Sequence, residues 1–197
     1  MMKPVFEAER EYIATMSKRN SDWIQTFTGK RFWPLDPQVE DVDIMDIAHS
    51  LALQCRFTGH VVVPYSGAEH SVRVMWECPE GDRLWGLLHD ASEAYLMDLP
   101  RPLKGVPGLG DVYKLAEARC MAVICEKFGL PIKIPKAVKE ADTRMLFTEK
   151  RDLMVETQYV WMGHVEPYSE KIRPWGWREA ETLYLMAFNG LTILSKS

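Results

Sequence analysis

Four polar side chains interrupt apolar helical patterns in this sequence: His70, His89, Asp90 and Asp142. An unpaired charge in a protein core is costly, so each of these groups needs a compensating partner. Two imidazoles and two carboxylates form a mixed nitrogen and oxygen set. Such a set suits a first-row divalent metal such as Mn, Fe, Co or Zn better than Ca, which prefers oxygen ligands. One metal ion would compensate all four groups at once.

Simpler interpretations of these four residues stay open at this point. A single buried His or Asp is usually a hydrogen-bonded structural residue. Asp142 could pair with Arg144 or Arg151 at the surface, and His70 could cap its own helical turn. Because the candidates belong to three different predicted helices, their spacing does not show that they meet in space.

The helices that must position the candidates have recognisable ends. Asp43 is the expected N-cap of a helix over "DVDIMDIAHSLALQC". Ser66 and Glu69 have the spacing of a capping box, which starts a helix at Ser66 and places His70 in its first turn. Gly81-Asp82 caps a further helix that contains His89 and Asp90 and ends by Leu99, before Pro100.

The rest of the chain is also predicted to be mainly helical. "GDVYKLAEARCMAVICEKFG" predicts a long helix closed by Gly129, and "KAVKEADTRMLFTEKRDLM" predicts another, with Asp142 inside its apolar stripe. An apolar helix, "WREAETLYLMAFNGL", ends the chain, as ordinary core or as an interface. Strand signals are limited to "WIQTFTGKRFW" and "HVVVPY". We expect an all-α, single-domain helical bundle over 1–197, with an N-terminal extension (1–42), a metal-site core (43–160) and a C-terminal helix (161–197).

Composition excludes several classes of protein. The 197 residues are 47% hydrophobic and 26% charged, as in an ordinary globular protein. The net charge of -4 predicts no broad basic face for duplex nucleic acid or an anionic membrane. No apolar run approaches the roughly 18–20 residues that span a bilayer. Residues 1–20 contain Glu7, Glu9 and Glu11, so we do not expect them to form a signal peptide.

The cysteines indicate a cytoplasmic protein. Cys55, Cys78, Cys120 and Cys125 form no C-x-x-C pair. We interpret them as reduced core thiols rather than as zinc ligands or disulfides.

Three stretches, read in order, carry a more specific signal: "YSGAEHSVRV", "LLHDASEAYLMDLPRPLK" and "VKEADTRML". Together they resemble the HD-domain metal-dependent phosphohydrolases. They are most similar to the bacterial and phage branch that includes deoxynucleoside 5'-monophosphatases and small phage dATP triphosphohydrolases. The preceding "IAHSLALQCRFTGH" also resembles the phage-type members.

The resemblance implies a role for each matching residue. His70, His89, Asp90 and Asp142 match the four metal ligands of the family. Glu93 and Asp98 match an acidic pair that handles the attacking water and the leaving oxygen. The spacing agrees independently for Glu93, because a residue three after Asp90 and four after His89 shares their face of a continuous helix.

The resemblance also implies substrate contacts. Arg56 and Phe57 match an arginine and aromatic pair that contacts phosphate and sugar or base, although the family aromatic is Trp. Arginine suits phosphate because its planar fork donates parallel hydrogen bonds. Lys104 is a second candidate phosphate contact, with a solvated loop lysine as the alternative. His49 and His60 are unassigned, and we expect His49 to fill the core.

The implied activity is metal-dependent hydrolysis at the α-phosphorus of deoxynucleoside mono- or triphosphates, with dATP- or dAMP-like purine substrates favoured. The metal would be Co, Mn, Zn or Mg. Relatives of this size suggest a homo-oligomer, a dimer or hexamer. Two alternatives stay open: a non-catalytic metal- or nucleotide-binding interaction domain, and a hydrolase of a signalling nucleotide.

Overall fold

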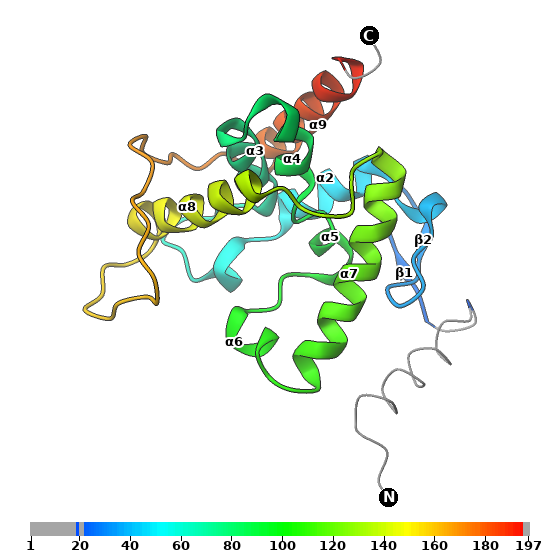
Figure 1. Cartoon of the computed structure of the whole chain (residues 1–197), viewed down its shortest axis with the longest axis horizontal. Coiled ribbons are helices and arrows are strands. Elements are labelled where there is room, and N and C mark those ends of the chain that lie inside the picture. Colours follow the sequence, from blue (N-terminus) through cyan, green and yellow to red (C-terminus); the bar gives the residue numbers. More distant parts are fainter. Residues whose placement is uncertain (1–18, 20–21, 195–197) are drawn as a thin grey trace, which may run out of the picture. The chain divides into compact units, whose positions relative to one another are not determined.

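A computed structural model describes residue 19 and residues 22–194 of the chain (Figure 1). The predicted N-terminal segment with Glu7, Glu9 and Glu11 lies outside the described residues. Among the described residues the secondary structure is almost entirely helical, and the sole sheet there has two strands. The prediction of an all-α fold class is confirmed.

The chain forms two compact units, and each combines two separate stretches of sequence. The first unit runs to Ile47 and resumes over Ser92–Ile132, whereas the second comprises Ala48–Ala91 and the chain from Lys133 onward. Helix α2, Ile44–Leu53, begins in the first and continues in the second. The expected subdivision into 1–42, 43–160 and 161–197 stays a prediction.

The described part of the first unit contains a hairpin, a 3-10 turn, the start of α2 and three further helices. Strands β1 (Ile24–Gln25) and β2 (Arg31–Phe32) pair antiparallel, which confirms the strand signal in "WIQTFTGKRFW". The 3-10 helix η1 covers Val39–Asp41. The helices are α5 (Glu93–Leu96), α6 (Arg101–Lys104) and α7 (Leu109–Phe128). α7 packs against η1, α5 and α6. Gly129 is left-handed and closes α7 as predicted.

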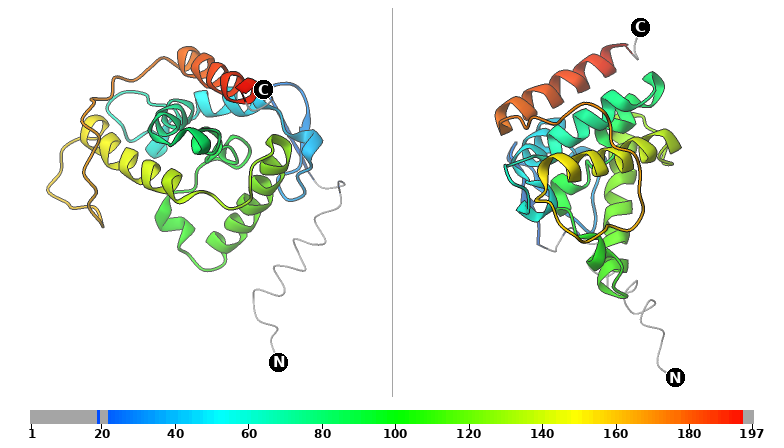
Figure 2. Two further views of the ribbon diagram at one scale, coloured as in Figure 1. Left: turned by 45° about the horizontal axis from the view of Figure 1, so that its top comes forward. Right: turned by 90° about the vertical axis from the view of Figure 1, so that its left-hand side faces the viewer.

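The second unit is organised around α3. This helix, Gly67–Glu77, packs against α4 (Arg83–Leu88), α8 (Lys136–Leu153) and α9 (Trp177–Leu194), and Figure 2 shows α9 lying along it. The unit also contains the short 3-10 helices η2 (Arg56–Gly59) and η3 (Glu80–Asp82). A Cβ atom on Gly86 would lie 2.9 Å from Met75 Cα, so α4 approaches α3 as closely as glycine permits.

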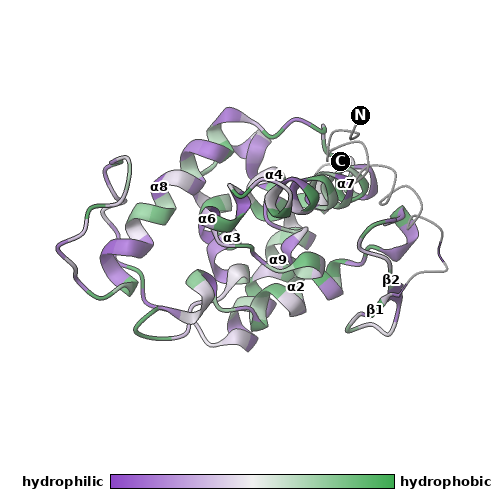
Figure 3. Ribbon diagram, turned by 90° about the horizontal axis from the view of Figure 1, so that it is seen from below, coloured by the Kyte–Doolittle hydropathy of each residue, from purple (hydrophilic) through white to green (hydrophobic). Residues whose placement is uncertain are grey.

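Hydropathy alternates along the helices, as expected for amphipathic packing. Figure 3 shows hydrophilic and hydrophobic stretches mixed along α8. On α9, Ala180, Tyr184 and Phe188 are buried, whereas Met186 is exposed. No described helix is long and apolar enough to cross a membrane.

Only half of the predicted capping box at the start of α3 forms. The Ser66 hydroxyl accepts a 3.1 Å hydrogen bond from the Glu69 N–H, so the helix starts where predicted. The Glu69 carboxylate, which is fully buried, instead accepts from Arg73 Nε at 2.9 Å and from the Trp175 N–H at 2.8 Å. Glu69 therefore attaches the segment before α9 to α3.

The prediction of one helix from residue 84 to the prolines is wrong. α4 ends at Leu88, residues 89–92 form a turn, and α5 begins at Glu93. His89 Nδ1 lies 2.8 Å from the Gly86 carbonyl, the acceptor that Asp90 N–H would use in a continuous α-helix. The Ala91 N–H then bonds to Leu88 O, a tighter three-residue step. His89 and Glu93 therefore do not share one helix.

Two smaller expectations also need correction. "HVVVPY" forms no strand; the pairing nearby is an isolated bridge between Cys55 and Ser66. All four cysteines are free, but only Cys78, Cys120 and Cys125 are buried. Cys55 is exposed because it lies in the connection after α2 rather than on a packed helix face.

Candidate metal centre

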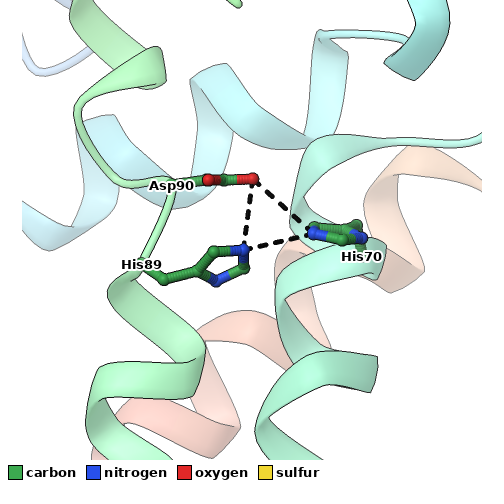
Figure 4. A group of neighbouring side chains, drawn as sticks. All are labelled: His70, His89 and Asp90. Carbon is green, nitrogen blue, oxygen red and sulfur yellow. Dashed lines mark hydrogen bonds and ion pairs between the residues drawn. The ribbon is translucent and has the colours of Figure 1, made fainter. Parts of the chain in front are cut away.

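The structure brings His70, His89, Asp90 and Asp142 together within the second unit. His70 comes from the first turn of α3, His89 and Asp90 follow the end of α4, and Asp142 lies on α8. The two Nε2 atoms are 3.2 Å apart. Asp90 Oδ2 lies 3.3 Å from His89 Nε2 and 3.6 Å from His70 Nε2 (Figure 4). Asp142 Oδ1 lies 3.3 Å and 3.8 Å from the same nitrogens of His70 and His89, respectively.

Both imidazoles are oriented through their other nitrogen. His70 Nδ1 lies 2.6 Å from Glu149 Oε1, and His89 Nδ1 lies 2.8 Å from the Gly86 carbonyl oxygen. A carbonyl oxygen and an ionised carboxylate can only accept, so each Nδ1 donates a proton. A donating Nδ1 leaves Nε2 as the nitrogen that binds a metal, which is the arrangement that protein metal sites use.

The donor set and its spacing fit a divalent metal. With metal–ligand bonds of roughly 2.0–2.2 Å, neighbouring ligand atoms of a tetrahedral site lie about 3.3–3.6 Å apart. The contacts among these nitrogens and oxygens cover 3.2–3.8 Å. One ligand atom from each of His70, His89 and Asp90 lies within 4.8 Å of the others, so this His-His-Asp group could hold a metal ion. Asp142 is placed to add a fourth ligand atom, which would be the second oxygen.

Burial and mutual charge set the protonation of this cluster. Burial lowers the pKa of His89, but Asp90 and Asp142 outweigh burial and raise it well above 6.5. Burial would raise the pKa of Asp142, yet its contacts with both histidines hold that pKa well below 3.8. The pKa of Asp90 is lowered against burial in the same way, mainly by His89. The metal-free cluster therefore keeps its carboxylates ionised and attracts cations.

Sequence reasoning missed Glu149, which contacts His70 and Arg56. Its side chain is fully buried on α8, two helical turns after Asp142. Glu149 Oε2 accepts from Arg56 Nε at 3.2 Å, while Oε1 faces His70. The spacing of seven residues places Asp142 and Glu149 on one helix face, and this spacing was the available signal.

The structure also brings Arg56 to the cluster. Its guanidinium lies between Glu149 and Asp90, with Nη1 3.5 Å from Asp90 Oδ2. Phe57 and Thr58, which follow, have left-handed φ angles of 55° and 54°. Such a conformation costs roughly 1–2 kcal/mol per residue. The Phe57 ring lies 6.1 Å from the Trp161 ring, on the segment after α8.

The predicted catalytic pair and Lys104 belong to the first unit. Lys104 Nζ lies 3.9 Å from Glu93 Oε1, 3.4 Å from Asp98 Oδ1 and 3.1 Å from Glu117 Oε1. Lys104 is therefore not the solvated loop lysine of the alternative interpretation. Burial lowers its pKa, but Glu117 and Glu93 outweigh burial and raise that pKa overall. Sequence reasoning missed Glu117.

The two unassigned histidines lie elsewhere. His49 is half-buried rather than part of the core, with Nδ1 3.0 Å from Glu181 Oε1 on α9. His60 is exposed and ends the turn that contains Phe57.

Comparison with known proteins identifies relatives without a described function. The chain is 44% identical to the "Uncharacterized protein YfdR" of Escherichia coli K12 over 139 residues, 71% of this chain and 76% of that protein. It is 38% identical to the "Uncharacterized protein RCAP_rcc00048" of Rhodobacter capsulatus over 134 residues, 61% of this chain and 67% of that protein. No family model matches the sequence.

Proposed function

Because this chain belongs to the same family as YfdR of Escherichia coli, whose function is not described, we propose a function from the site itself: metal-dependent hydrolysis of deoxynucleotides by an HD-type phosphohydrolase. The observation that carries the proposal is the convergence of His70 Nε2, His89 Nε2, Asp90 and Asp142, with both Nδ1 atoms engaged elsewhere. Two imidazoles that are almost fully enclosed and point with two carboxylates at one position serve metal binding better than they serve packing.

The residues would divide the chemistry as follows. His70, His89, Asp90 and Asp142 would hold a divalent cation, with Mn, Co, Zn or Mg as candidates. When bound, such an ion polarises a phosphoryl oxygen and makes a water ligand more acidic. The Arg56 guanidinium, at Asp90, binds the phosphate and stabilises the charge that develops on it.

Proton transfer is assigned to the acidic pair that the HD resemblance singles out. Glu93 takes the proton of the attacking water, and Asp98 delivers one to the leaving 5'-oxygen. Lys104 Nζ lies 3.9 Å from Glu93 Oε1 and 3.4 Å from Asp98 Oδ1, so one cation adjoins both members of the pair. Attack at the α-phosphorus of a deoxynucleoside monophosphate then yields a nucleoside and phosphate, and of a triphosphate a nucleoside and triphosphate.

The experiment that tests this function is product analysis after metal exchange. The full chain is stripped with a chelator, and Co, Mn, Mg or Zn is restored singly. Deoxy- and ribonucleoside mono- and triphosphates are then offered, and the products are separated by chromatography. We expect a deoxynucleoside with phosphate or intact triphosphate, in a metal-dependent manner. Metal binding without turnover of any nucleotide would instead support the non-catalytic interaction domain.

A further inference from the structure

One carboxylate links the candidate metal centre to the candidate phosphate-binding arginine. Glu149 is fully buried, and each of its oxygens has its own partner: Oε1 lies 2.6 Å from His70 Nδ1, and Oε2 lies 3.2 Å from Arg56 Nε. Burial would raise the pKa of Glu149, but Arg56 and His70 outweigh burial and lower it. The carboxylate is therefore ionised and accepts from both partners.

Both partners of Glu149 also contact other residues of the candidate metal centre. His70 presents Nε2 to His89 and Asp142, and Arg56 Nη1 lies 3.5 Å from Asp90. His70 and Arg56 come from segments more than ten residues apart. Among the described residues, Glu149 is the carboxylate that contacts His70 Nδ1 and Arg56 Nε. The orientation of His70 and the placement of Arg56 consequently depend on the same side chain of α8.

We propose that Glu149 is a positioning residue that orients His70 Nε2 toward the metal and holds the Arg56 guanidinium at the phosphate position. This inference rests on the proposed function. A carboxylate on the distal nitrogen of a metal-binding imidazole fixes its ring orientation and increases its basicity. The same carboxylate reduces the entropy that Arg56 would lose on binding phosphate, because the guanidinium is already in place.

The first test needs no metal. A short hydrogen bond from His70 Nδ1 to an ionised carboxylate gives a slowly exchanging, strongly downfield proton in NMR spectra, which His70→Gln assigns by its loss. We expect this proton in the metal-free parent and in Glu140→Gln, a matched change at an exposed site on α8 that pairs with Lys136. It should be absent in Glu149→Gln. Its persistence in Glu149→Gln would overturn the inference.

The second test is metal affinity by calorimetry, with Mn or Zn alone as the ligand. Loss of such a supporting group costs about 10–100-fold in affinity. We expect this loss in Glu149→Gln and an unchanged affinity in Glu140→Gln. An affinity of Glu149→Gln within twofold of the parent would contradict the proposal. A parent with the downfield proton but without any metal binding would overturn the proposed function and the metal-positioning role together.

The substitution leaves Arg56 without its buried anion, so folding is checked by circular dichroism. If Glu149→Gln does not fold, the double variant Arg56→Gln/Glu149→Gln, which leaves no unpaired charge at this pair, takes its place in both tests. Arg56→Gln alone should keep the His70 proton and raise KM more than it lowers metal affinity. Equal losses in Arg56→Gln and the double variant would show that Glu149 does not orient His70.

Discussion

The Nε2 atoms of His70 and His89 lie 3.2 Å apart, and each ring donates its Nδ1 proton to an acceptor on the far side. If both rings were neutral, two lone pairs would face each other across this gap. A proton or a metal ion must therefore lie between them. Asp90 and Asp142 surround the same gap, so their charge favours either cation.

This arrangement predicts opposite pH trends for stability and metal affinity. Burial opposes the charge on His70 and His89, but the carboxylates raise both pKa values above 6.5. A raised histidine pKa contributes stability that is complete below about pH 6.5 and is lost as the pH rises through the folded pKa. Asp90, Asp142 and Glu149 have lowered pKa values, so their contribution is lost as the pH falls below about 4.5.

Metal-free protein should accordingly be less stable to urea near pH 9 than near pH 6, while metal affinity increases over that interval because protons leave Nε2. Urea titrations and calorimetry at matched pH values measure both trends. His89→Gln should weaken the pH dependence of stability. Parallel trends of stability and affinity would contradict the assignment of Nε2 as the shared proton and metal site.

Asp90→Ala should abolish metal binding and activity and leave a largely helical fold. Asp90 Oδ2 lies next to Nε2 of both histidines. We therefore expect its removal to lower metal affinity by more than the 10–100-fold that is typical when a group supporting a ligand is lost. Asp82→Ala is the matched control, since Asp82 lies at the other end of α4 and makes no side-chain cap. Metal titration and product analysis measure the two effects. Hydrolysis by Asp90→Ala at the parent rate would contradict the assignment of Asp90 as a metal ligand.

Glu93→Ala should retain the metal and lose turnover, because Glu93 is proposed to move a proton rather than to bind the ion. General acid–base catalysis contributes roughly 10²–10⁴-fold, which sets the expected loss in kcat. Glu126→Ala, an exposed change on α7 of the same unit, should leave kcat unchanged. Loss of metal from Glu93→Ala would make Glu93 a ligand or a structural residue instead.

Gly86→Ala should disturb both packing and the metal centre. Its new Cβ would lie 2.8 Å from Cys78 Sγ and 2.9 Å from Met75 Cα, so α4 must move away from α3 at a cost of about 1–3 kcal/mol. The shift also moves the carbonyl that orients His89, and metal affinity should fall.

Gly190→Ala is the control for Gly86→Ala. A Cβ at Gly190 on α9 meets nothing within 4 Å, so this substitution should be neutral or slightly stabilising. Urea unfolding measures the difference in stability between Gly86→Ala and Gly190→Ala. Equal stabilities would show that α4 and α3 are not held as closely as the distances indicate.

Local hydrogen bonding explains why much of the fold was predictable. Asp43 accepts from the Met45 N–H and Ser66 from the Glu69 N–H, and both bonds connect residues two or three positions apart. Gly129 closes α7 for a similarly local reason. The sequence also indicated the candidate ligands His70, His89, Asp90 and Asp142, because polar residues in apolar stripes need partners wherever they lie.

Tertiary structure decided the rest, because those contacts join residues far apart in the chain. Whether Asp142 meets His70 depends on how α8 packs against α3, and no spacing specifies this. The seven-residue spacing places Glu149 on the helix face of Asp142, but only tertiary packing shows that its carboxylate is buried between His70 and Arg56. Sequence by itself therefore determined the helical class and the candidate ligands, through short-range periodicity and capping. Only the packing of separate helices decided which charged side chains contact one another.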